Sequence, residues 1–200
     1  MNYLAVLDYD HLDNALFLQS FAEALSAQKN TRGIILHGDS RYTERLIQTG
    51  MLTDDARKRS SKDLNHRLVA LLADSGVAAV GINAYQRRTV RYDGSVLTPD
   101  RTFLTGFPQD SHLLLSNLVE DTRSAAPLPY DLAEMARSLY RLLDLDELFV
   151  FPKNESAEIP LTESAHLLPE DLQRLKPPYR LVSFRSFGRL PDLKETRLIE

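Results

Sequence analysis

Short apolar runs alternate with amphipathic stretches along the chain, and this alternation limits the fold more than any other feature. Buried strands are predicted at residues 4–7, 33–37, 77–82 and 148–151. Between the first two strands, one face of a predicted helix carries Leu18, Phe21, Ala22 and Leu25. Leucine stripes at 64–72 and 132–143 predict further helices. Strands that alternate with helices favour βαβ units and a largely parallel sheet.

The sequence therefore predicts one α/β domain over residues 1–200, a three-layer sandwich around a largely parallel central sheet. Asp93-Gly94 lies between β-rich flanks and predicts a hairpin inserted after the third strand. Residues 113–119 are interpreted as a short helix, and Pro169 suits the start of another. Residues 179–184 and 196–199 predict the last strands.

Charge and composition exclude several classes of protein. Lys and Arg number 24 against 28 Asp and Glu, a net charge of −4, so there is no basic excess to neutralise nucleic-acid phosphates. The absence of cysteine excludes disulfides, thiolate metal sites and a cysteine nucleophile. No apolar run approaches the ~18 residues of a membrane span, and residues 1–4 lack the basic start of a signal peptide. We expect a cytoplasmic protein with neither nucleic acid nor membrane as partner.

Polar residues at the strand ends are the first site candidates, because ligands of parallel sheets bind beyond the carboxyl ends of the strands. The candidates after the second and third strands are His37, Gly38, Asp39, Ser40 and Asn83. Backbone N–H groups at a glycine turn before a helix favour an anion, although the Asp39 carboxylate opposes one. The alternative is that Asp39 or Ser40 caps a helix ending near Gly50 while His37 packs at the strand end.

The first strand ends in the acidic turn Asp8-Tyr9-Asp10-His11. Asp8 and Asp10 are candidates for a shared divalent metal. The Asp-x-Asp pattern resembles the nucleophile loop of haloacid-dehalogenase-type phosphatases, which implies Asp8 as a catalytic residue. That family has Thr or Val where Leu12 stands and a later acidic pair at a strand end, which is missing here. The alternative is a solvated turn before the next helix. No other metal site is predicted, because no histidines are paired at helical spacing.

A collinear series of short motifs over residues 3–165 resembles the amino acid kinase family, and acetylglutamate kinases most closely. Ile34-Ile35-Leu36-His37-Gly38 resembles the strand and His-Gly-Gly turn of that family. The stretch 65–72 resembles its Asn-Lys-Glu-Leu-Val-x-Leu-Leu helix, and 79–82 resembles the next strand. Further resembling segments are a short helix at 110–118, an Ala-Asp-Thr-Ala-like turn at 130–133, a strand at 148–151 and a segment at 159–162.

The resemblance also implies groups that this sequence lacks. The first strand of the family leads into a Lys-x-Gly-Gly-Ser type loop, whereas this strand leads into Asp8-Tyr9-Asp10. Asp39 replaces the second glycine of the His-Gly-Gly turn. The substrate arginine of the family has no aligned counterpart, although Arg57 and Arg59 are nearby. After Thr162 the family needs a long nucleotide-binding segment, and about forty residues remain here.

We therefore predict an amino-acid-kinase-like domain that is shortened at its C-terminal end. Residues 1–128 resemble the substrate and dimerisation half, and residues 129–200 a reduced nucleotide half. Phosphoryl transfer depends on positioning and charge neutralisation, and loss of one charge-stabilising donor typically costs about two to three orders of magnitude in rate. The predicted function is a degenerate acetylglutamate-kinase-like protein that acts as a small-molecule-binding or assembly subunit.

The resemblance also implies site residues and partners. Asp131 is the catalytic position of the family that persists, and its alternative role is an acid favoured by a helix dipole. An acidic small molecule is expected at Gly38, Asn83 and the unaligned arginines, and a homodimer through the helix Tyr42–Gln48. An active amino acid or acylamino acid kinase with a rearranged Mg-ATP site remains an alternative, as does the phosphatase. Mg-ATP is predicted as a cofactor only under the kinase alternative, and no cofactor is predicted otherwise.

Overall fold

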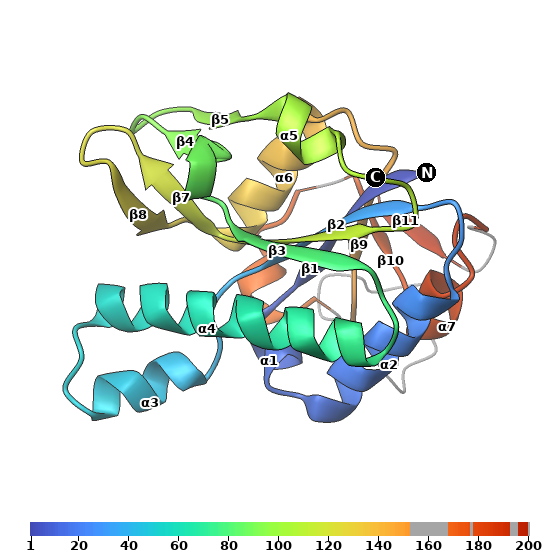
Figure 1. The fold of residues 1–200 in the computed structure, drawn as a ribbon, viewed down its shortest axis with the longest axis horizontal. Helices are drawn as coiled ribbons and strands as arrows, with labels where there is room; N and C mark the ends of the chain where they lie inside the picture. Colours follow the sequence, from blue (N-terminus) through green and yellow to red (C-terminus); the bar gives the residue numbers. More distant parts are fainter. Residues whose placement is uncertain (153–167, 177, 193–195, 200) are drawn as a thin grey trace.

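A computed structural model describes residues 1–152, 168–176, 178–192 and 196–199. Its main feature is a seven-stranded sheet, with strand order β11-β10-β9-β1-β2-β6-β3 (Figure 1). Every neighbouring pair is parallel except β10 and β11. The strands are β1 (Asn2–Leu7), β2 (Arg32–His37), β3 (Ala79–Asn83), β6 (His112–Ser116), β9 (Glu147–Val150), β10 (Tyr179–Leu181) and β11 (Arg197–Ile199). The largely parallel central sheet is thus confirmed.

Helices cover both faces of this sheet (Figure 1). Helices α2, α4 and α7 pack on one face, and α6 packs on the other beneath a smaller sheet. Strand β1 shows why, since Leu4 and Val6 belong to one core and Tyr3, Ala5 and Leu7 to the other. The helices are α1 (Tyr9–Leu12), α2 (Ala15–Ala27), α3 (Tyr42–Gln48), α4 (Thr53–Asp74), α5 (Arg101–Thr105), α6 (Leu132–Leu142) and α7 (Phe184–Phe187), with 3₁₀ turns at Gln86–Arg88 and Glu170–Leu172. The predicted three-layer sandwich is confirmed.

A smaller sheet lies over the α6 face of the main sheet, with order β5-β4-β7-β8. Its strands are β4 (Val90–Tyr92), β5 (Leu97–Pro99), β7 (Leu118–Asp121) and β8 (Ala126–Pro129). The predicted hairpin is the antiparallel pair β4–β5, and Gly94 adopts a φ of +99° in its turn. Asp93 Oδ1 fixes that turn by accepting the N–H groups of Ser95 and Val96. The second hairpin, β7–β8, was not predicted.

The helix predicted at 113–119 is wrong, and so is the resemblance of 110–118 to a short helix. These residues form β6, between β2 and β3, and the start of β7. Leu113 and Leu115 enter one core while Leu114 enters the other, so both faces of the strand are buried. A short apolar run that is buried on both faces has no period that separates strand from helix.

Smaller differences concern element ends. Strand β10 stops at Leu181, because Ser183 caps α7 by accepting the N–H of Ser186. Pro169 precedes a 3₁₀ turn rather than an α-helix. The resembling segment at 159–162 lies outside the described residues.

No helix in the described part of the chain is long and apolar enough to cross a membrane.

Candidate functional site

The carboxyl ends of β2 and β6 meet the start of α6 around a hollow of about 300 Å³. We call it the carboxyl-end hollow, and its lining residues are Gly38, Asp39, Arg57, Asn117, Pro129, Tyr130, Asp131 and Leu132. Three predicted site residues, Gly38, Asp39 and Asp131, therefore border one space. Gly38 and Asp39 lie there because they follow β2, a parallel strand of the main sheet. Asp131 is brought there by Tyr130, whose backbone is hydrogen-bonded to Asn117 after β6.

Arg57 is the cation of the carboxyl-end hollow. It lies near the start of α4, and its Nε is 3.9 Å from Oδ2 of Asp39. The Asp39 carboxylate also accepts the hydroxyl of Thr43 at 2.9 Å, so its negative charge is held toward α3. The repulsion expected between Asp39 and an anionic ligand is therefore offset by an exposed guanidinium on the same wall. From the sequence alone, Arg57 was only an arginine near the expected position of the family's substrate arginine, without an alignment to it.

Asn117 joins β6 to the turn before α6. Its Nδ2 donates to the carbonyl of Tyr130 at 2.6 Å, and the Tyr130 N–H donates back to the Asn117 carbonyl at 3.0 Å. The side chain is only 8% exposed, and its Oδ1 accepts no hydrogen bond from the described residues. Sequence reasoning missed Asn117 and Tyr130, because the helix expected at 113–119 hid the strand end that carries Asn117.

Asp131 begins α6 at the rim of the hollow. Its Oδ1 accepts the N–H of Glu134 at 2.9 Å, which is the geometry of an N-cap. The structure thus agrees with the alternative role of Asp131, an acid at the start of a helix, and adds a capping hydrogen bond to it. A role in catalysis stays a prediction.

His37 lies behind the hollow and is closed to solvent. Its Nδ1 lies 2.9 Å from the Gly38 carbonyl, and its Nε2 lies 3.1 Å from Nδ2 of Asn65. Burial lowers the pKa of His37 to about 4, so the ring is neutral, with Nδ1 donating and Nε2 accepting. Asn65 also donates to the carbonyl of Ile82. The ring therefore ties α4 to the strands and does not face a ligand.

Asn83 and Ser40 also take structural positions. Asn83 Oδ1 accepts the Ser116 hydroxyl at 2.9 Å, and its backbone N–H donates to Oε1 of Gln86. Ser40 is buried, and its Oγ accepts the N–H of Tyr42 in the first turn of α3. Neither residue borders the carboxyl-end hollow.

The end of β1 is closed by a buried acidic and basic pair. Asp8 Oδ1 accepts the His11 N–H at 3.0 Å and lies 2.5 Å from His11 Nδ1. The other ring nitrogen, Nε2, lies 3.2 Å from the carbonyl of Pro152, which follows β9. Phe17 stacks on the imidazole with 4.0 Å between ring centroids. Both nitrogens thus face oxygen acceptors of the chain itself. The predicted solvated turn is instead a buried one at Asp8 and His11.

Asp10 does not share a site with Asp8. Its Oδ1 lies 3.5 Å from Nη2 of Arg41, and Asp8 is turned toward His11. Across the described ranges, no group of three or more His, Asp or Glu side chains is arranged to hold a metal ion. The geometry gives the metal-dependent phosphatase no support.

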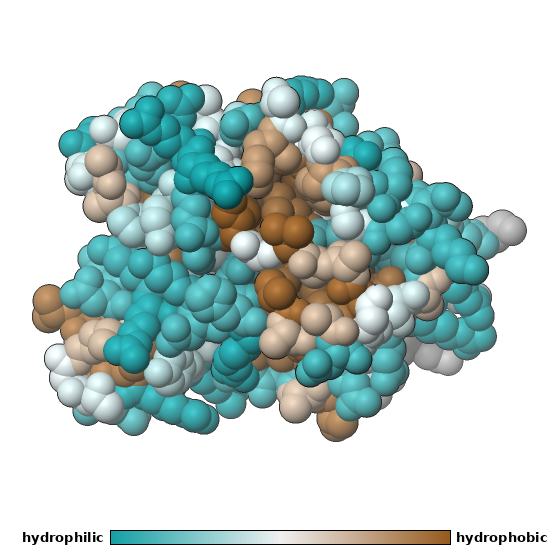
Figure 2. Space-filling view, viewed as in Figure 1, coloured by the Kyte–Doolittle hydropathy of each residue, from teal (hydrophilic) through white to brown (hydrophobic). Residues whose placement is uncertain are grey.

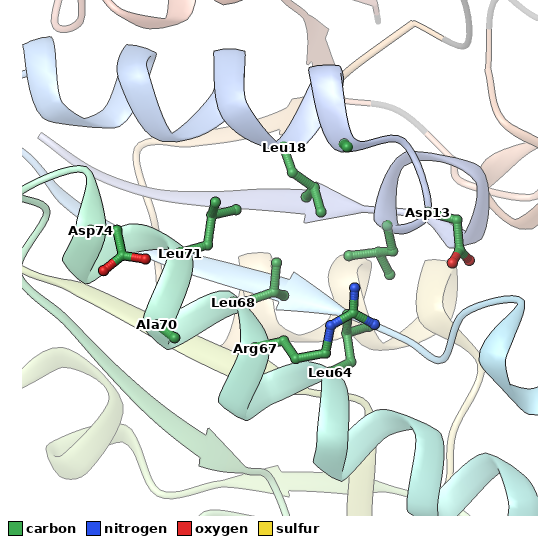
Figure 3. Close-up of a pocket in the computed structure, with 10 residues that line it drawn as sticks. Asp13, Leu18, Leu64, Arg67, Leu68, Ala70, Leu71 and Asp74 are labelled. Atoms are coloured by element: carbon green, nitrogen blue, oxygen red, sulfur yellow. The ribbon is translucent and has the colours of Figure 1, made fainter.

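A groove between α2 and α4 is a second hollow, of about 420 Å³ (Figure 3). Leu18, Leu68 and Leu71 point into it, and Asp13 and Asp74 lie toward its two ends. It shares no lining residue with the carboxyl-end hollow. Its floor is apolar and lies in the helix layer, and its charged lining residues are Asp13, Arg67 and Asp74.

Comparisons with known proteins identify the fold. No protein-family model and no curated protein matches the sequence. An isopentenyl phosphate kinase solved with its substrate matches at a TM-score of 0.66 and 13% identity, covering 100% of both chains. N-acetylglutamate synthase from Neisseria gonorrhoeae with coenzyme A and L-arginine matches at 0.63 and 15%, covering 94% of this chain and 57% of that one. E. coli aspartokinase III with aspartate and ADP matches at 0.60 and 10%, covering 92% and 62%.

These structural neighbours are members of the amino acid kinase family, so the chain has the fold of that family. At these identities the likeness establishes the fold alone. The specific nearness to acetylglutamate kinases stays a prediction.

Proposed function

We propose that this chain is a small-molecule-binding subunit built on the amino acid kinase fold, without efficient phosphoryl transfer. The observation that carries the proposal is the closed end of β1. Where the resemblance implies a lysine and a glycine-rich loop, Asp8 and His11 are buried and paired. A phosphoryl group needs free N–H donors and cations there, and both nitrogens of His11 already face acceptors.

The ligand is proposed to be an acidic small molecule in the carboxyl-end hollow. Arg57 supplies a guanidinium that can pair with a carboxylate, and this pairing is charge-assisted. Asn117 Oδ1, buried and without a donor among the described residues, suits an N–H or O–H group of the same ligand. Asp39 and Asp131 disfavour a ligand of high negative charge, such as a polyphosphate.

Substitution of Arg57 tests this assignment. Calorimetric titration with L-glutamate, N-acetyl-L-glutamate, L-aspartate and acetate should give saturable heat for at least one of them. Arg57→Gln should weaken that binding by about tenfold to a hundredfold, the range of a hydrogen bond to a charged group. Arg59→Gln is the matched control, because Arg59 is exposed on the same helix and pairs with Asp63. No binding by any probe, or equal losses in both variants, would contradict the assignment.

An active kinase with a rearranged site is the competing proposal. Asp131 at the rim of the hollow favours it, because that position matches the Ala-Asp-Thr-Ala motif of the resemblance. ADP release from Mg-ATP, dependent on one of the acidic probes, would establish the kinase.

Cytoplasmic localisation and the homodimer through Tyr42–Gln48 also remain proposals. On that helix Ile47 is 38% exposed, and Leu52 just beyond it is 74% exposed.

A further inference from the structure

The groove between α2 and α4 is separate from the carboxyl-end hollow, and its floor is made of leucines. Leu64 and Leu68 line it from α4 and Leu18 lines it from α2, and each is less than a tenth exposed. Exposed Ala15 and Ala70 also line it. Its volume of about 420 Å³ is within the usual range of small-molecule sites. A narrow groove over a closely packed apolar floor suits an unbranched aliphatic chain.

The surface of α4 changes along the length of the helix. Figure 2 shows hydrophilic surface over its first half, and hydrophobic side chains appear over its second half. From Leu64 to Asp74, the Lys, Arg, Asp and Glu positions are Arg67 and Asp74 alone. Both of these residues line the groove. Two opposite charges are therefore set into an otherwise apolar part of the helix surface.

Arg67 and Asp74 lie at different places along the groove. They are seven residues apart, so they share one face of α4 with Leu71 between them. Figure 3 shows the Arg67 guanidinium toward the Asp13 end of the groove and the Asp74 carboxylate at the opposite end. Both side chains are exposed, and neither has an ion-pair partner within the described ranges. Each charge is therefore available to a ligand.

The two ends of the groove favour groups of opposite charge. Asp74 is the last residue of α4, and the last turn of that helix has no basic residue, so the helix dipole adds negative potential there. At the other end, Oδ2 of Asp13 accepts the N–H of Arg41 at 2.6 Å. Because Asp13 shares that end with Arg67, the guanidinium can balance a single carboxylate but not a more highly charged anion.

We propose that this groove binds a linear zwitterion, an ω-amino acid with its carboxylate at Arg67 and its ammonium at Asp74. Both pairings are charge-assisted. The methylene groups between them lie over Leu18, Leu68 and Leu71, where they lose contact with water. The proposal does not depend on the proposed function, because the groove and the carboxyl-end hollow share no lining residue.

The spacing of the two charges sets the length of the ligand. Seven residues of helix separate the Cα atoms of Arg67 and Asp74 by about 10 Å. The arginine side chain leans toward the start of α4 and lengthens the gap, whereas two hydrogen bonds of about 3 Å shorten the part that the ligand spans. A chain of about six carbons fits the remainder.

Nuclear magnetic resonance titration of the full chain tests the ligand class. We expect 6-aminohexanoate to shift the amide signals of Leu18, Leu68 and Leu71 saturably. Hexanoate and hexylamine carry one charge each, 4-aminobutanoate is shorter, and 1,6-diaminohexane carries two positive charges. Each should bind at least about threefold more weakly, because each loses one ion pair or its geometry.

Three outcomes of that titration would overturn the proposal. One is the absence of saturable shifts with every probe. Another is equal or tighter binding of 1,6-diaminohexane, which would make the groove a site for dications. The third is a set of shifts centred on Arg57, which would place the carboxylate in the carboxyl-end hollow instead.

Charge variants test the two ends of the groove. Arg67→Gln and Asp74→Asn should each raise the dissociation constant of 6-aminohexanoate by about threefold to fivefold. Arg59→Gln and Asp54→Asn are the matched controls, since both residues are exposed on α4 and neither lines the groove. The double variant Arg67→Asp with Asp74→Arg exchanges the charges, so it should bind the ligand in the reverse direction with nearly unchanged affinity. Equal losses in the controls, or no binding by the double variant, would contradict the assignment.

Discussion

Asp8 and His11 decide what the end of β1 can bind. A lysine at this place would present three free donors, and a glycine-rich loop would add backbone N–H groups. Here Asp8 presents a carboxylate and His11 has an oxygen beside each ring nitrogen. A like charge about 4 Å from a phosphate oxygen costs about 4 kcal/mol at an effective dielectric constant of about 20. The pairing of Asp8 with His11 reduces that repulsion, but neither of these two side chains offers a free donor to the phosphate.

His37 gives the fold a pH dependence at the residue scale. Burial lowers the pKa of His37 to about 4 and that of His112 to about 4, whereas an unfolded imidazole titrates near 6.5. The unfolded chain therefore binds more protons in this window, so stability that is full above about pH 6.5 is lost as pH falls toward about 4.

His37→Gln should remove about half of the decrease in the free energy of unfolding between about pH 6.5 and 4. The other half should remain, because it comes from His112. Urea unfolding at several pH values measures it, and exposed His66 provides the control variant His66→Gln. An unchanged slope for His37→Gln would show that His37 is not the group that titrates.

At the scale of elements, α6 connects the fold to the candidate site. Leu132, Ala133, Met135, Ala136 and Leu139 bury one stripe of the helix against the sheet. Asp131 caps it, and the Asn117–Tyr130 hydrogen bonds fix the turn before it. The packing and capping that stabilise α6 therefore also shape the carboxyl-end hollow.

Substitutions at Asp131 separate the cap from the charge. Asp131→Ala should lower the free energy of unfolding by about 1 kcal/mol, whereas Asp131→Asn should lower it by only a few tenths, because asparagine also caps. Urea unfolding measures both. An Asp131→Ala variant as stable as the unmodified chain would show that the cap contributes nothing and that the residue is kept for another reason.

At the scale of the molecule, apolar periodicity was enough to predict the layers and the largely parallel sheet. It failed at 113–119, because this run is buried on both faces and its leucines, unlike Val6 in β1 or Ile34 and Ile35 in β2, do not favour a strand over a helix. Part of the lining of the carboxyl-end hollow was predicted. Gly38 and Asp39 follow a strand and Asp131 precedes a helix, and the apolar pattern locates both elements. Arg57 and Asn117 reach the hollow through the packing of α4 and the strand order, and neither is visible in local spacing.

We propose that a protein with the amino acid kinase fold here lacks a functional phosphoryl-transfer site. Calorimetric titration of the chain with Mg-ATP at millimolar concentration tests this proposal. We expect no saturable heat and no rise in the melting temperature. Saturable binding of Mg-ATP, followed by ADP release with an acidic substrate, would contradict it.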